Sequence, residues 1–368
     1  ISGWNISSFL IASNMFDGTG LSADISFNIW QNWSSVSSIN QTNATAIGQV
    51  MNSLNIIDLS GLYEDPSFNI DIGIWDVSAV TDMSRMFNGA ESFDQDISSW
   101  DVSMVTNMSS MFHTAISFNS GIFKLNASSQ VNNMSSMFQT ALSFNQDISG
   151  WNVSRVTDMS HMFQGAESFD QDISGWNIST LQIANNMFDG TGLSHNISFN
   201  IWQNWSSVSS INNTNATAIG QVMNSLNIID LSGLYNGDTS FNIDISGWDV
   251  SMVTDMSRMF NGAESFKQDI GGWDVSGVKD MSSMFNGAIR FNQDISGWNV
   301  SGVTNMSRMF KGAESFNQDI SGWNISSLQI ATNMFDGTGL TADISFNIWQ
   351  NWSSVSSINN TNATAIGQ

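Results

Sequence analysis

The sequence lacks cysteine altogether and holds very few basic residues. Without cysteine, neither a disulfide framework nor a cysteine-based zinc site can form, so packing must hold the fold. Lysine and arginine together number 9 against 32 acids, which gives a formal net charge of −23. Because such a surface repels phosphate backbones and anionic lipid headgroups, we expect no nucleic-acid partner.

Long hydrophobic runs are also missing. No apolar run approaches the roughly 18 residues that a membrane span needs, so we expect no membrane span in this chain. Charged residues make up 11% of the sequence, well below the roughly 25% of ordinary soluble proteins. The hydrophobic share of 41% is enough for a continuous core. Solubility must therefore come from Ser, Asn, Thr and Gly, or from attached sugar.

What the sequence holds instead is repetition at two scales. A leading Phe recurs every 25 residues, once 26, and a Trp follows at the same step; the Trp positions are Trp75, Trp100, Trp151, Trp176, Trp248, Trp273, Trp298 and Trp323. A longer period is marked by SSVSSIN(Q/N)TNATAIGQ, which begins at Ser34, Ser206 and Ser353. Self-similarity of this kind is typical of a solenoid of stacked coils.

We therefore predict one continuous repeat solenoid over residues 1–368, cut from a longer chain because both ends recur inside the sequence. Regular coils are predicted at 68–192 and 241–339. Irregular, insert-bearing coils are predicted at 21–67, 193–240 and 340–368. Whether each insert is a bulging loop or a pair of degenerate coils stays open.

The two halves of a coil favour different local structures. Met108, Met111 and Phe112 fall at helical spacing, whereas Phe93 to Trp100 is rich in β-branched and aromatic residues and suits a short strand. The predicted fold class is an α/β solenoid. It is a leucine-rich-repeat-like, right-handed stack of about 25-residue coils, with a parallel β-sheet on one side and short helical or 3₁₀ segments on the other. The alternative is a β-solenoid without helices.

The recurring phrase Phe-Asn-Gln-Asp-Ile-Ser-Gly-Trp-(Asp/Asn)-Val-Ser-x-Val-Thr-(Asp/Asn)-Met-Ser-x-Met-Phe-x-Gly-Ala resembles the BspA-type leucine-rich-repeat surface proteins. That family occurs in bacterial surface lipoproteins and in aquatic microbial eukaryotes. The resemblance covers regular coils such as 68–188 and 241–335, and the inserts depart from it. It implies a cell-surface or secreted protein with a role in adhesion or matrix, and it implies no reaction.

Candidate catalytic and metal-binding residues are weighed against plainer roles. We predict no enzyme, because no Ser-His-Asp arrangement, metal-ligand spacing or phosphate-binding glycine loop occurs. The histidines His113, His161 and His195 occupy variable positions and are expected to be exposed. A recurring aspartate predicts turn-capping carboxylates, with a calcium ladder as the alternative and no other cofactor. It comprises Asp71, Asp96, Asp147, Asp172, Asp244, Asp269, Asp294 and Asp319.

The Trp column favours a core role over a sugar-binding platform, while Trp30 and Trp33 in the insert keep more of the latter possibility. Asn-x-Ser/Thr sequons also recur in the inserts, where clustered acceptors predict N-linked glycans in a secreted protein. These candidates are Asn32, Asn40, Asn43, Asn204, Asn212, Asn215, Asn351, Asn359 and Asn362.

Weaker candidates lie mostly in the regular coils. They are Asn5, Asn107, Asn126, Asn133, Asn152, Asn177, Asn196, Asn299, Asn305 and Asn324. Asn152 and Asn299 share their position in the repeat with aspartates such as Asp76, which indicates a side-chain cap that either residue can make.

These observations together predict an extracellular or cell-surface structural protein that forms or sheathes a glycosylated fibre or surface appendage. Its expected partners are N-linked glycans and copies of itself, or the continuing chain, placed end to end. The alternative is a cell-surface adhesin that recognises a protein or a glycan.

Overall fold

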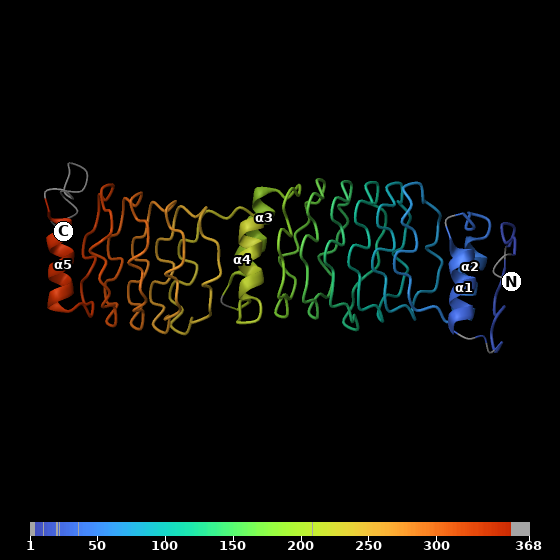
Figure 1. Ribbon diagram of the computed structural model, residues 1–368, viewed down its shortest axis with the longest axis horizontal. Helices are drawn as coiled ribbons and strands as arrows, with labels where there is room; N and C mark the ends of the chain where they lie inside the picture. The colour runs from blue at the N-terminus through green and yellow to red at the C-terminus, as the bar shows by residue number, and fades with distance from the viewer. Residues whose placement is uncertain are drawn as a thin grey trace. The chain divides into compact units, whose positions relative to one another are not determined.

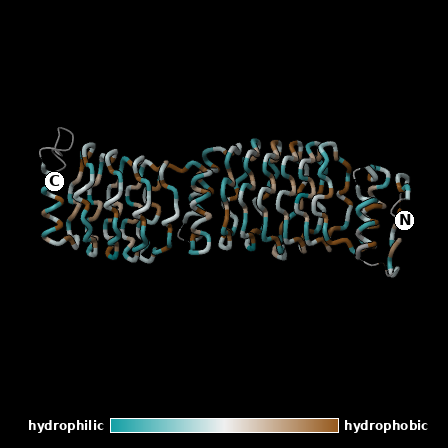
Figure 2. The backbone as a smooth tube through the Cα atoms, in the orientation of Figure 1, coloured by the Kyte–Doolittle hydropathy of each residue, from teal (hydrophilic) through white to brown (hydrophobic). Residues whose placement is uncertain are grey.

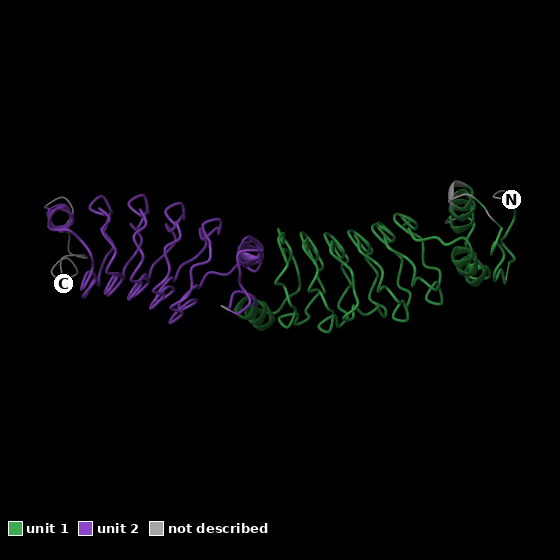
Figure 3. Cartoon of the chain, turned by 90° about the horizontal axis from the view of Figure 1, so that it is seen from below, with its two compact units in different colours: residues 1–204 green, residues 205–368 purple. Residues whose placement is uncertain are grey.

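The computed structural model of the protein describes residues 4–9, 11–19, 21, 23–35, 37–207 and 209–354. Their contacts divide the chain into two compact units, residues 1–204 and 205–368 (Figure 3). Unit 1 contains α1 (Ala23–Ser34) and α2 (Ala44–Ser53), then a run of coils. The helix α3 (His195–Trp205) follows this run and ends at the first residue of unit 2. Unit 2 contains α4 (Ala216–Ser225), further coils and α5 (Ala342–Trp352) (Figure 1).

The described parts of the inserts contain helices, which neither a bulging loop nor a pair of degenerate coils foresees, and residues 58–63 after α2 stack on the next coil as a regular coil does. In α1 the side chains of Ile29, Trp30 and Trp33 are buried, at spacings that place them on one helical face. In α2 the residues Ile47, Val50 and Met51 are buried in the same way. Each helix therefore forms because one apolar stripe is covered, while its own backbone satisfies its hydrogen bonds.

The insert helix α2 takes the place of a coil beneath the next Trp. The Trp75 Nε1–H donates to the Ala44 carbonyl at 2.9 Å. The ring lies so close to Gly48 that a Cβ there would stand 2.5 Å from Trp75 Cδ1, closer than any real side chain tolerates. Gly220 and Trp248 repeat the arrangement in unit 2, also at 2.5 Å. The glycine in Ala-Thr-Ala-Ile-Gly-Gln is thus required by the packing of the following coil.

The predicted fold class is wrong. Among the described residues there is no β-strand or sheet, and the five helices belong to the inserts rather than to every coil. Neighbouring coils meet through isolated parallel bridges, such as Asp82 with Asn107 and Asn107 with Asn133. Neither the leucine-rich-repeat-like layout nor the alternative β-solenoid describes this arrangement.

A chain of turns explains the error. The Met86 N–H donates to the Met83 carbonyl at 3.3 Å, and Arg85, the third residue of that turn, has φ 58°. Gly89 has φ 77° one turn later. A positive φ at the third position is what a type II turn requires, and it interrupts both helix and strand. The apolar spacing of three that suggested a helix therefore arises from consecutive turns.

Within the turns, every second backbone N–H is not used by the turn itself and donates to a carbonyl of the neighbouring coil. The Met83 N–H donates to the Asn107 carbonyl at 3.0 Å, and the Arg85 N–H to the Ser109 carbonyl at 2.9 Å. These donors come from one coil and their acceptors from the next coil along the chain. Within each unit successive regular coils repeat these forward bonds up to the last coil, while other N–H groups point back, as Thr106 N–H does to the Thr81 carbonyl at 2.8 Å. The backbone groups of neighbouring coils thus satisfy one another.

The core of each unit is built from aromatic columns. In unit 1 the ring centroids of Phe112 and Phe138 lie 5.5 Å apart, and those of Phe138 and Phe163 5.8 Å apart, all fully buried. The Trp176 indole donates to the Ile148 carbonyl of the preceding coil at 3.1 Å. All eight Trp of the column are at most 6% exposed, which confirms their core role. Figure 2 shows hydrophobic and hydrophilic residues alternating along each coil.

Candidate functional surface

The recurring aspartates cap turns, as predicted. In each, Oδ1 accepts the N–H of the residue two positions later; the distance is 3.0 Å at Asp147 and 2.9 Å at Asp294. The other members of the column are Asp71, Asp96, Asp172, Asp244, Asp269 and Asp319. Within the part of the chain that the structure describes, no group of three or more His, Asp or Glu could hold a metal ion.

In six of these aspartates the residue two positions later is a serine that also lowers the pKa of the carboxyl group; they are Asp96, Asp147, Asp172, Asp244, Asp294 and Asp319. Ser149 Oγ donates to Asp147 Oδ1 at 2.7 Å, and this hydrogen bond, together with that from the Ser149 N–H, lowers the pKa of Asp147. The same two donors on Ser98 lower the pKa of Asp96. A lowered pKa keeps the carboxylate charged near neutrality, which suits a hydrogen-bond acceptor and not a general acid.

A second polar column was missed by sequence reasoning. In most coils the side chain of the residue directly after the leading Phe accepts the backbone N–H of its counterpart in the next coil; Lys267 is an exception. Asn119 N–H donates to Asp94 Oδ1 at 2.9 Å, and Asn145 N–H to Asn119 Oδ1 at 2.8 Å. The signal was present, because Asn or Asp fills that position in nearly every coil. The column joins neighbouring coils through side chains at the surface.

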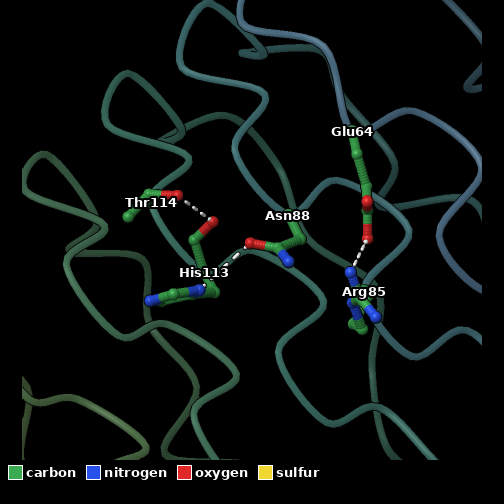
Figure 4. A network of polar contacts seen from close by, with 5 residues as sticks. All are labelled: Glu64, Arg85, Asn88, His113 and Thr114. Atoms are coloured by element: carbon green, nitrogen blue, oxygen red, sulfur yellow. Dashed lines mark hydrogen bonds and ion pairs between the residues drawn. The ribbon is translucent and has the colours of Figure 1, made fainter.

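The histidines lie in surface networks. His113 is half-buried rather than exposed, and its Nδ1 lies 3.0 Å from Asn88 Oδ1 of the preceding coil (Figure 4). Burial lowers the pKa of His113. Beside it, Arg85 pairs with Glu64 at 2.8 Å. His161 is also half-buried, so the expectation of exposure holds for His195 alone. His113 therefore links neighbouring coils through a hydrogen bond.

The strongest sequon candidates fall into two groups. Asn32, Asn204 and Asn351 are exposed on α1, α3 and α5, and in each Nδ2 donates to the carbonyl four residues earlier. Asn40 and Asn212 are half-buried, and the Oδ1 of each accepts the N–H two residues later. These five side chains reach the surface of their units.

The other insert sequons are placed differently. Asn43 and Asn215 are 0% exposed. Asn43 Nδ2 donates to the carbonyls of Ile6 at 3.1 Å and Ser38 at 2.9 Å, so its amide is enclosed by backbone. This placement argues against sugar on Asn43 and Asn215 in the folded chain. Asn359 and Asn362 lie outside the described residues.

The weaker sequons mostly make turns. In nine of them Oδ1 accepts the N–H of the serine two positions later; they are Asn5, Asn107, Asn126, Asn133, Asn152, Asn177, Asn299, Asn305 and Asn324. The cap interpretation of Asn152 and Asn299 is thereby confirmed. Asn196 instead lies exposed on α3.

The insert tryptophans do not offer a sugar platform. Trp30 and Trp33 are 2% and 1% exposed, and Trp30 lies against Trp75 with the ring centroids 5.7 Å apart. Their faces are taken up by packing within unit 1. The exposed indoles are instead Trp4 and Trp349, at 52% and 62%.

Near-identical coils, joined by backbone bridges and interrupted by helices, define a tandem-repeat protein. The chain belongs to the family described as "Mycoplasma protein of unknown function, DUF285", whose model matches four successive segments, residues 34–130, 126–225, 203–298 and 271–365. No curated protein and no solved structure matches the chain. In the described residues, no helix has the length and apolar character to cross a membrane.

Proposed function

We propose that this chain is an extracellular structural repeat protein that forms or sheathes a glycosylated fibre or surface appendage. The observation that carries the proposal is that one pattern of coil-to-coil hydrogen bonds repeats at equivalent positions within each unit. Each coil donates from equivalent positions, as Met83 does to Asn107, and accepts at equivalent carbonyls. Because every coil offers the same two faces, a stack lengthens by whole coils without new chemistry. That property suits a scaffold.

The surface chemistry supports the same role. The net charge of −23 discourages association with nucleic acid and with anionic membranes. Among the insert sequons, Asn32, Asn204 and Asn351 expose their side chains on helices, which makes them the amides best placed to carry sugar. The resemblance to BspA-type surface proteins belongs to this proposal and adds an expected cell-surface location.

Site-resolved glycopeptide mass spectrometry of the protein from its native source tests the glycan part. We expect sugar on Asn32, Asn204 and Asn351, since these side chains are exposed on helices. Asn43 and Asn215 serve as internal controls, because they carry an Asn-Ala-Thr sequon in buried surroundings. Unmodified peptides at all three exposed positions would contradict the proposal that the inserts carry N-linked glycans.

The second candidate is an adhesin. It is favoured by exposed aromatic side chains on the insert helices, Phe199 on α3 at 51% and Phe346 on α5 at 57%. Exposed aromatics are enriched where proteins recognise partners. Immunogold labelling of intact cells separates the two roles: label along continuous fibres supports the scaffold, and label scattered over the surface without fibres supports the adhesin.

A further inference from the structure

Four Asn-Gly pairs recur at one position of the coils, directly after a buried Phe or Tyr. Their asparagines are Asn88, Asn236, Asn261 and Asn286. An asparagine side chain reacts with the backbone most readily when glycine follows it, because glycine has no side chain to hinder the approach of its nitrogen. Each pair is half-buried or exposed, so water reaches it. The four pairs are therefore candidate sites of chemical modification.

The modification in question is deamidation, and it begins at the glycine N–H. Once this group loses its proton, the nitrogen attacks Cγ of the asparagine, and the new N–Cγ bond closes a succinimide ring. The side-chain amide leaves as ammonia with a proton from solvent. Water then opens the ring at either carbonyl, which gives aspartate or isoaspartate. The net reaction consumes water and releases ammonia, and isoaspartate lengthens the main chain by a carbon atom.

The neighbouring coils hold all four glycine N–H groups. The Gly89 N–H donates to the His113 carbonyl of the next coil at 2.8 Å, and the N–H groups of Gly237, Gly262 and Gly287 donate to their next coils at 2.7 Å. A nitrogen whose N–H is engaged in this way does not lose its proton or turn towards Cγ. The succinimide can therefore form only after the hydrogen bond to the following coil has opened.

The last regular coil of unit 1 lacks this hydrogen bond. Gly190 occupies the same position in that coil, but its N–H has no acceptor within the described residues, and the residue before it is Asp189. One coil earlier, the Gly165 N–H donates to the Asp189 carbonyl at 2.7 Å. Gly165 and Gly190 have nearly the same φ, 71° and 69°. Neighbouring coils thus offer two glycines of like conformation that differ in this bond.

We propose that the Asn-Gly pairs are deamidation sites closed by the stacking of the coils, and that their modification marks a coil whose bond to the next coil has opened. Asn286 shows the role of the bond most directly. Among the described residues its half-buried side chain has no hydrogen-bond partner, so the bond from the Gly287 N–H to the Lys311 carbonyl is what protects the pair. Isoaspartate formed in an opened coil changes the main-chain length, which makes the opening irreversible.

Two substitutions place the same Asn-Gly pair before each kind of glycine. Gln164→Asn places it before Gly165, whose N–H is bonded, and Asp189→Asn before Gly190, whose N–H is not. Both chains are incubated near neutral pH, folded and in concentrated urea, and peptide mapping by mass spectrometry follows deamidation at each asparagine. Folding should slow the reaction at least about tenfold at Gln164→Asn and at the native Asn286, but by less than about threefold at Asp189→Asn.

Both variants should fold, because Asn88 and Asn261 occupy the same position in other coils, and circular dichroism checks this. Equal protection of the two introduced pairs would show that the rigidity of the coils controls the reaction rather than the glycine hydrogen bond, and it would overturn the proposal. Deamidation of Asn286 at the same rate in folded and unfolded chains would overturn it as well. Neither result depends on fibre formation or glycans, so the proposed function is tested separately.

Discussion

The regular coils and the insert helices solve the same packing problem in different ways. A regular coil such as that ending at Ala115 satisfies its backbone through its neighbours and its own turns, and it buries Phe112 between the aromatic rings of adjacent coils. The helix α2 satisfies its own backbone and presents one apolar stripe. The Trp of the following coil makes the same hydrogen bond in both cases. The Trp100 Nε1–H donates to the Ile72 carbonyl of a coil, and the Trp75 Nε1–H donates to the Ala44 carbonyl of α2. Either a coil or a helix can lie beneath the Trp, because the indole N–H needs only a backbone carbonyl there to accept its hydrogen bond.

The largest expected effect concerns the columns of the regular coils. Phe138→Ala removes a fully buried ring that lies between Phe112 and Phe163, so we expect a loss of about 3–5 kcal/mol in the free energy of unfolding. Urea denaturation followed by far-ultraviolet circular dichroism measures it. A loss below about 1 kcal/mol would mean that the aromatic columns do not hold the coils together.

The junction between helix and coil comes next. Gly48→Ala places a methyl group 2.5 Å from Trp75 Cδ1, and such overpacking costs about 1–3 kcal/mol. Gly150→Ala is the matched control, since nothing lies within 4 Å of a Cβ there, and it should change stability by less than about 1 kcal/mol. Equal effects of the two substitutions would contradict the account of why the insert helix contains glycine.

A smaller effect concerns the turn caps of the coils. The Ser78 hydroxyl and N–H lower the pKa of Asp76 in the folded chain. A depressed folded-state pKa stabilises the fold above the unfolded-state pKa of about 3.9, and this contribution is lost as pH falls through the folded-state pKa. Asp76→Asn should keep the turn, as Asn152 does at the equivalent position, and remove that part of the pH dependence.

Thermal melting between pH 6 and pH 3 checks this expectation. The wild-type chain should lose more stability on acidification than Asp76→Asn, while the two should melt alike near neutrality, within about 1 kcal/mol. The paired comparison matters because acid also relieves repulsion within a chain of net charge −23. If both chains lose the same stability between pH 6 and pH 3, the hydrogen bonds from Ser78 do not lower the pKa of Asp76 in the folded chain.

The smallest expected change in stability concerns Tyr63, which lies at the end of an insert, next to the first regular coil. Tyr63 stands where regular coils have Phe, as at Phe87, and its buried hydroxyl has no hydrogen-bond partner within the described residues. Tyr63→Phe should therefore leave stability unchanged or raise it by up to about 1 kcal/mol. A clear destabilisation in the same urea experiment would indicate a bound water or another partner for that hydroxyl.

The repeat itself could be predicted from the sequence, and so could the roles of the residues that recur in nearly every coil. Asp147 and Trp176 recur once per coil, and a turn cap and a core indole are the commonest ways to use such residues. The series of consecutive turns could not be predicted, because it depends on positive φ values at Arg85 and Ser110. Arginine and serine rarely adopt a positive φ, so these residues gave no signal of a turn. An apolar spacing of three does not distinguish a helix from consecutive turns.

The insert helices were missed for a different reason. Their apolar positions, Ile29, Trp30 and Trp33, do follow helical spacing, but clustered serines and sequons around them suggested a loop. The same bias affected the glycan candidates. Asn43 has the sequon of an exposed acceptor, yet the fold uses its amide to join Ser38 and Ile6. Only three-dimensional placement separates it from Asn32.

Imaging of filaments from the native source at a resolution that shows helices tests the central claim most directly. We expect filaments or a filament sheath in which helical inserts alternate with runs of helix-free coils. The spacing should follow the sequence, where Ser34, Ser206 and Ser353 mark successive inserts. Filaments without such alternation, or a protein found only as isolated particles, would contradict the structural role.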